Sequence, residues 1–284
     1  MKPIEDCTAG IVGMGIMGGA VAMALGKLAP ARLLACDPDA GAAGAALAEG
    51  VIHEAFTDAA AMLGRCDLVY LCINPSALLG FMDAHMNDFK SGTLITDIAG
   101  VKGNIVKVME VKLRGDLDFI PGHPMAGSEK GGYAQAHKCD FRGKNYILTP
   151  LKRNKTENLS YLKDLIRRMG FGRITVTTPE DHDRKIAFTS QLCHIIAASL
   201  IDCEADTEIT RFGGGSFEDL TRIAMLNVPM WTELFLENKK ELLARIGRFE
   251  ESLDAIRALI AADDRAALEA RLGAVRERRL AMTG

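Results

Sequence analysis

The sequence has little that would suit a secreted, membrane-spanning or nucleic-acid-binding protein. Its 284 residues carry a formal net charge of −3, so no excess of positive charge favours nucleic acid or an anionic membrane surface. The longest strongly apolar stretch, residues 186–201, is too short and too polar to span a bilayer, because it contains Ser190, Gln191 and His194. No basic-then-apolar leader precedes the first expected strand, so we expect a cytoplasmic protein.

The cysteines follow no pattern that would indicate disulfides or a metal site. There are seven of them, an odd number, and no pair has the C-x-x-C spacing. No histidines cluster at a spacing typical of zinc ligands. We therefore expect reduced thiols, mostly in the core, and no bound metal.

A glycine-rich turn carries the first functional signal. A short apolar strand ending at Val12 runs into Gly-x-Gly-x-x-Gly at Gly13, Gly15 and Gly18, and helix-forming residues follow. Gly13 would allow the tight turn, Gly15 would let a pyrophosphate approach the backbone, and Gly18 would let the helix pack on the strand. Free N–H groups at the start of the helix would face the phosphates.

An acidic residue supports a dinucleotide site. Asp37 ends the second apolar run, 19 residues after Gly18, where a carboxylate would bind the adenosine ribose. No arginine directly follows Asp37, so NAD is favoured over NADP. A glycine-rich turn in another kind of α/β domain is the alternative. The predicted cofactor-binding residues are Gly13, Gly15, Ile16, Met17, Gly18, Asp37 and Asn74.

Alternating strand and helix patterns predict an α/β fold, with a Rossmann-like doubly wound parallel sheet first and an all-helical region after it. We place the boundary near Pro179, giving an NAD-binding domain over residues 1–179 and a helical domain over 180–284. The helical domain would bind substrate and form a homodimer. Expected strands cover residues 8–12, 32–36, 67–73, 92–96, 119–121, 146–148 and 173–176, and expected later helices cover 181–203, 217–226, 230–260 and 263–282.

Two regions carry candidate substrate-site residues. His123 follows an apolar strand in a loop flanked by Gly122 and Pro124, where a neutral imidazole could accept a hydroxyl proton, or could only bond the loop backbone. In the helical region, Arg222 could bind a carboxylate, or could form an ion pair with a neighbouring acidic residue. His194 would be either a ligand of the substrate or a core histidine. Lys102 and Lys130 could contribute further cations, although a solvated surface position is the commoner one for a lysine.

The loop Gly122-His123-Pro124-Met125-Ala126-Gly127-Ser128-Glu129 and the segment Asp219-Leu220-Thr221-Arg222-Ile223-Ala224 resemble the prephenate dehydrogenase family. The resemblance implies NAD-dependent oxidation of the ring hydroxyl of prephenate to give 4-hydroxyphenylpyruvate and carbon dioxide, or the same reaction on arogenate. It implies that His123 takes the hydroxyl proton, that Arg222 binds a substrate carboxylate and that His194 lies in the substrate site. It also implies a homodimer.

The sequence departs from the family pattern at one position. Many members carry a serine that orients the catalytic histidine, and Gly100 stands at the matching position here. Water, Ser128 or the backbone could replace that hydroxyl, so the predicted substrate-binding residues are Arg222, His194, Ser128 and Gly100. Some relatives also have histidine where Gln191 stands.

Two other functions compete with this interpretation. A β-hydroxyacid or 6-phosphogluconate dehydrogenase would also combine a Rossmann start with a helical domain. It would need a Gly-x-x-x-Lys context that Lys185 lacks, and it would leave His123 without a role. An NAD-sensing module would not need His123 and Arg222 together.

Overall fold

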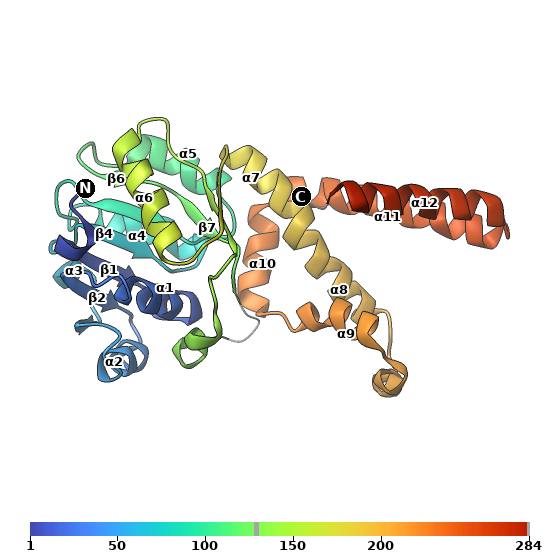
Figure 1. The fold of residues 1–284 in the computed structure, drawn as a ribbon, viewed down its shortest axis with the longest axis horizontal. Helices are drawn as coiled ribbons and strands as arrows, with labels where there is room; N and C mark the ends of the chain where they lie inside the picture. Colours follow the sequence, from blue (N-terminus) through green and yellow to red (C-terminus); the bar gives the residue numbers. More distant parts are fainter. Residues whose placement is uncertain (128–130, 283–284) are drawn as a thin grey trace. The chain divides into compact units, whose positions relative to one another are not determined.

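The computed structural model describes residues 1–127 and 131–282, and the chain forms two compact units, residues 1–238 and 239–284. The first unit contains a six-stranded sheet in the order β3-β2-β1-β4-β5-β6, with all neighbouring strands parallel (Figure 1). This order reverses between β1 and β4, as in doubly wound dinucleotide-binding folds. The strands are β1 (Thr8–Val12), β2 (Arg32–Cys36), β3 (Glu54–Phe56), β4 (Leu68–Leu71), β5 (Leu94–Asp97) and β6 (Asp118–Phe119).

Helices cover both faces of this sheet because its strands are apolar on both sides. Alternate residues of β4 enter different cores: Leu68 and Tyr70 face one helical layer, and Val69 and Leu71 face the other. Helices α1, α2 and α6 pack on the first face, and α3, α4 and α5 pack on the second. Their bounds are α1 (Ile16–Gly26), α2 (Ala40–Ala48), α3 (Ala60–Leu63), α4 (Pro75–His85), α5 (Gly103–Lys112) and α6 (Thr156–Arg168).

A second, three-stranded sheet was not predicted. It consists of β7 (Gly122–Pro124), β8 (Asn145–Leu148) and β9 (Arg173–Val176), with β7 antiparallel to β8 and β8 parallel to β9. The prediction of a loop at His123 was therefore wrong, because this residue lies on β7 opposite Ile147. Glycine and proline at the two ends of a three-residue strand hide its strand character in the sequence.

The region after Thr178 is helical, as predicted, and residues 179–282 contain no strand. Thr178 caps α7 by accepting the N–H of Asp181. A π-helical turn, η3, joins α7 to α8 in one continuous helix. The helix bounds are α7 (Pro179–Ile186), η3 (Ala187–Gln191), α8 (Leu192–Asp202), α9 (Gly215–Thr221) and α10 (Val228–Glu237). The 3-10 helices are η1 (Ile4–Asp6), η2 (Tyr133–Lys138), η4 (Thr207–Phe212) and η5 (Arg222–Ala224).

The second unit is a pair of helices, α11 (Lys239–Ala261) and α12 (Arg265–Ala281). Asp264 caps α12 by accepting the N–H of Ala267. The single helix predicted over residues 230–260 is instead two helices that are separated at Asn238, whose φ of −106° and ψ of 22° are not helical. Within residues 1–127 and 131–282, no helix is long and apolar enough to cross a membrane, and no group of His, Cys, Asp and Glu is arranged to hold a metal ion.

Candidate active site

The glycine-rich turn connects β1 to α1, and two of its glycines are required by the protein's own packing. Gly13 has φ of +89°, and a Cβ there would lie 2.5 Å from the carbonyl oxygen of Cys72. A Cβ on Gly18 would lie 1.8 Å from the carbonyl oxygen of Gly13. Gly15 precedes the first residue of α1 and has nothing within 4 Å of its Cβ position. The turn therefore has open space at the N-terminus of a helix, as a phosphate site requires.

Asp37 follows β2 and reaches this turn. Its Oδ2 accepts the N–H of Met14 at 2.6 Å, and its Oδ1 accepts the N–H of Asp39 at 2.8 Å. The carboxylate thus lies beside the glycine-rich turn, where the predicted ribose contact places it.

A cavity of about 410 Å³ lies at the carboxyl ends of the strands and extends to the helices that follow β9. Seven of the predicted site residues line it: Ile16, Met17, Asn74, Gly100, His123, His194 and Arg222. Of the four remaining cofactor residues, Gly13, Gly15 and Gly18 belong to the adjoining turn, and Asp37 bonds to it from the end of β2. Ser128 and Lys130 lie outside the described residues, although Gly127, the neighbour of Ser128, lines the cavity.

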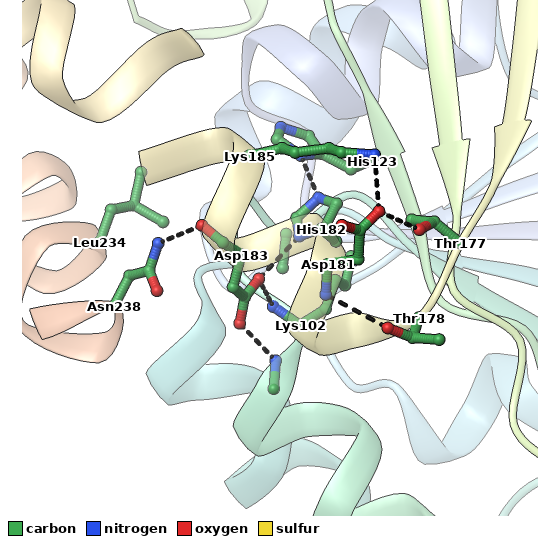
Figure 2. Close-up of polar contacts among 12 residues, drawn as sticks. Lys102, His123, Thr177, Thr178, Asp181, His182, Asp183, Lys185, Leu234 and Asn238 are labelled. Carbon is green, nitrogen blue, oxygen red and sulfur yellow. Dashed lines mark hydrogen bonds and ion pairs between the residues drawn. The ribbon is translucent and has the colours of Figure 1, made fainter. Parts of the chain in front are cut away.

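His123 is the titratable group at the centre of the site. Its Nδ1 lies 2.9 Å from Nε2 of His182, and Nδ1 of His182 lies 2.7 Å from Oδ1 of Asp183 (Figure 2). Burial lowers the pKa of His123 well below its usual value near 6.5, and the neighbouring His182 ring and the charge of Lys102 add to this effect. The imidazole is therefore neutral at neutral pH, as a proton acceptor must be.

His182 and Asp183 were not predicted from the sequence, yet they form the hydrogen-bonded chain that reaches His123. They lie in the first turns of α7, and His182 is 1% exposed. Burial lowers the pKa of His182, and its hydrogen bond to Asp183 opposes that shift. Nothing in the sequence indicates that a His-Asp pair reaches a histidine 59 positions earlier.

Lys102 contradicts the expectation of a solvated lysine or a substrate-binding cation. Its side chain and that of Asp97 are both fully buried, and Nζ lies 2.5 Å from Oδ2 of Asp97. Burial lowers the pKa of Lys102 and the neighbouring carboxylates oppose this effect. Asp97 also accepts the N–H of Ala99 and of Gly122. The ion pair therefore fixes the residue that precedes His123.

Gly100 faces His123 without a side chain. A Cβ at this position would lie 3.1 Å from Cδ2 of Leu234 and 3.9 Å from Cε1 of His123. Leu234 therefore occupies the space next to the histidine at the position where the resemblance predicts a serine.

The helical side of the cavity presents His194 and Arg222. Nδ1 of His194 lies 2.9 Å from the carbonyl oxygen of Ser190, so this nitrogen carries the proton. The ring packs on Trp231 with 3.7 Å between centroids. Burial lowers the pKa of His194, and the positive charge of Arg222 adds to this effect.

Gln191 lines the same cavity, but its side chain forms hydrogen bonds to other residues of the protein. Its Nε2 donates to the carbonyl oxygen of Leu234, and its Oε1 accepts from Asn238. Both bonds cross from the π-helical turn to the end of α10. Such turns are frequent at functional sites, and this one places Ser190 and Gln191 at the cavity wall.

Two family profiles match this chain, and together they span most of it. The prephenate dehydrogenase nucleotide-binding domain matches residues 21–176, and the prephenate dehydrogenase dimerization domain matches residues 178–274. The chain belongs to the prephenate dehydrogenase family. It is thus a dehydrogenase of this family, which confirms the resemblance and disfavours the β-hydroxyacid alternative. The boundary predicted near Pro179 stays a prediction.

Known members of the prephenate dehydrogenase family align over most of the chain. The prephenate dehydrogenase of Bacillus subtilis (strain 168) is 31% identical over 272 residues, which are 93% of this chain and 72% of that protein. The cyclohexadienyl dehydrogenase of Zymomonas mobilis is 33% identical over 207 residues, 70% of each chain. The crystal structure of the A. aeolicus prephenate dehydrogenase in complex with hydroxyphenyl propionate and NAD+ has a TM-score of 0.87 at 29% identity, and covers 97% of this chain and 98% of that one.

Proposed function

We propose that this protein oxidises prephenate with NAD+, releasing carbon dioxide and 4-hydroxyphenylpyruvate. The observation that carries the proposal is that Met17 beside the dinucleotide turn, His123 and Arg222 line the same cavity. A hydride acceptor, a proton acceptor and a carboxylate-binding cation would thus meet around one small substrate.

The residues present fit NAD+. The glycine turn leaves open space at the N-terminus of α1, and Asp37 lies beside it as a partner for a ribose hydroxyl. When bound, NAD+ supplies the hydride acceptor. The anionic Asp37 would oppose a 2′-phosphate, which supports NAD+ over NADP+.

His123 takes the proton of the ring hydroxyl as the ring carbon that bears this hydroxyl loses hydride. The ring carboxylate then leaves as carbon dioxide, and its bonding electrons complete the aromatic ring. His123 returns the proton to the phenolate oxygen, so the residue ends the cycle neutral. Arg222 holds a substrate carboxylate throughout, and its forked guanidinium suits this group.

The choice of prephenate over arogenate rests on the charge of the described cavity wall. The ionisable side chains that line it are His123, His194 and Arg222, all cationic or neutral. They suit the carboxylates and keto oxygen of prephenate better than the ammonium group of arogenate.

The test offers each substrate separately with NAD+ and follows NADH by its absorbance. We expect a higher kcat/KM with prephenate. Preference for arogenate would keep the reaction and overturn the substrate assignment. No NADH with either substrate would contradict the proposed function.

We also infer a homodimer formed through the helical region. The matched dimerization domain supports this, as do exposed apolar side chains such as Phe212, Val228 and Leu236, which are 87%, 67% and 66% exposed. Light scattering after size-exclusion chromatography should give twice the chain mass of 30.6 kDa. A concentration-independent monomer would contradict the inference.

A further inference from the structure

We propose that His182 and Asp183 together fix the protonation pattern of His123, with His182 as the positioning residue that replaces an orienting hydroxyl at Gly100. The kinetic part of this proposal rests on the proposed function. The structural part does not, because it concerns which ring nitrogen of His123 carries the proton.

Asp183 accepts two backbone hydrogen bonds. Its Oδ1 accepts the N–H of Lys102 at 2.9 Å, and its Oδ2 accepts the N–H of Gly103 at 2.7 Å. These N–H groups belong to the first turn of α5, where the helix dipole stabilises a negative charge. Asp183 is therefore held as an acceptor, and the contact from Nδ1 of His182 must be a donated hydrogen bond (Figure 2).

The protonation state of His182 follows from this contact. With its proton on Nδ1, a neutral His182 has a lone pair on Nε2. That lone pair accepts the proton of Nδ1 of His123, 2.9 Å away. His123 then keeps its own lone pair on Nε2, and this nitrogen is available to accept a proton from a substrate in the cavity. Each ring thus sets the tautomer of the next.

The opposite side of His123 provides no competing partner among the described residues. Gly100 has no side chain, and the nearest atoms to its Cβ position belong to Leu234, which is apolar. The carbonyl oxygen of Leu234 is itself held by Gln191, and the carbonyl oxygen of Asp183 by Asn238. Within residues 1–127 and 131–282, the hydrogen bond that orients His123 is therefore the one to His182.

The same arrangement keeps the protonated intermediate state of His123 hydrogen-bonded. When Nε2 takes the hydroxyl proton, the imidazolium keeps its Nδ1–H bond to His182, and His182 keeps its bond to the carboxylate of Asp183. The new positive charge thus faces a buried negative charge through one polarisable ring. The buried Lys102 opposes this charge, but Asp97 compensates the lysine directly.

Two substitutions at His182 separate positioning from packing. His182→Gln keeps an acceptor near the position of Nε2, whereas His182→Asn keeps only a donor near the position of Nδ1. We expect His182→Asn to lower kcat about 100-fold or more with little change in KM for NAD+, and His182→Gln to restore most of kcat. His137→Asn, on an exposed histidine, is the matched control and should leave kcat unchanged. Equal losses in both His182 variants, or no loss in His182→Asn, would overturn the positioning role.

A second measurement needs no substrate and no His182 variant. Nitrogen-15 labelling of the six histidines gives ring spectra that report which nitrogen carries the proton. We expect His123, assigned by the peak missing in His123→Asn, to carry it on Nδ1, although free neutral histidine prefers Nε2. A proton on Nε2 of His123 would overturn the proposal even if the protein oxidises prephenate. A proton on Nδ1 would support it even if prephenate is not the substrate.

Discussion

The buried ion pair between Lys102 and Asp97 gives a prediction with two independent readouts. Both side chains are fully buried and 2.5 Å apart. In Lys102→Met, Asp97 would stay buried with only the N–H groups of Ala99 and Gly122 as partners. Removing one member of a buried pair costs about 3–5 kcal/mol. Since a domain is stable by only about 5–15 kcal/mol, the variant should fold but unfold at much lower urea concentration.

The matched control is Lys112→Met. Lys112 also pairs with one aspartate, Asp83, but each side chain is 51% exposed. Exposed pairs contribute at most about 1 kcal/mol. Urea unfolding of the two variants therefore isolates the effect of burial. A loss in Lys102→Met no greater than in Lys112→Met would refute the claim that the buried pair stabilises the fold.

The second readout is the protonation of His123. The positive charge of Lys102 is one of the groups that lower the pKa of His123. Removing this charge should raise that pKa, so the acid limb of the pH profile of kcat/KM should move to higher pH in Lys102→Met. An acid limb that stays in place would show that Lys102 does not act on His123.

Three further predictions concern the base, the cation and the dinucleotide turn. Because the pKa of His123 lies well below 6.5, kcat/KM of the wild type should keep its full value at pH 6.5. It should fall about tenfold per pH unit only at lower pH. Half-maximal kcat/KM at pH 6.5 would contradict this prediction. Arg222→Ala should raise KM for prephenate about 10- to 100-fold with a smaller change in KM for NAD+, and an unchanged KM in steady-state kinetics would remove its substrate role. Gly18→Ala should abolish NADH binding in a fluorescence titration, because its Cβ would lie 1.8 Å from the carbonyl oxygen of Gly13. The control Gly80→Ala on α4, where no atom lies within 4 Å of the Cβ position, should bind NADH normally. Tight binding by both variants would contradict the turn geometry.

The parts of the fold that the sequence predicts are those specified by neighbouring residues. β1, the glycine turn and α1 follow from one continuous pattern, and the observed bounds of β1 and β2 match the predicted ones. Asp37 reaches the turn because it ends the strand next to β1. His123 and Arg222 line one cavity although 99 positions separate them, and only the family resemblance predicted that they would act together.

The parts that the sequence does not predict depend on long-range packing. The hydrogen bond from His123 to His182 joins β7 to α7, and no local pattern specifies it. Lys102 carries a charge and looks like a surface residue in the sequence, yet tertiary packing buries it against Asp97. The helix break at Asn238 has the same origin, because its amide donates to the carbonyl oxygen of Asp183.

His123→Asn tests most directly whether His123 accepts the hydroxyl proton in this cavity. We would measure the single-turnover rate of NADH formation from prephenate in the wild type and in His123→Asn, with NADH affinity measured alongside. We expect the rate to fall at least about 100-fold while NADH binds with nearly unchanged affinity. A rate equal to that of the wild type would show that the proton goes elsewhere and would contradict the role of His123 as the proton acceptor.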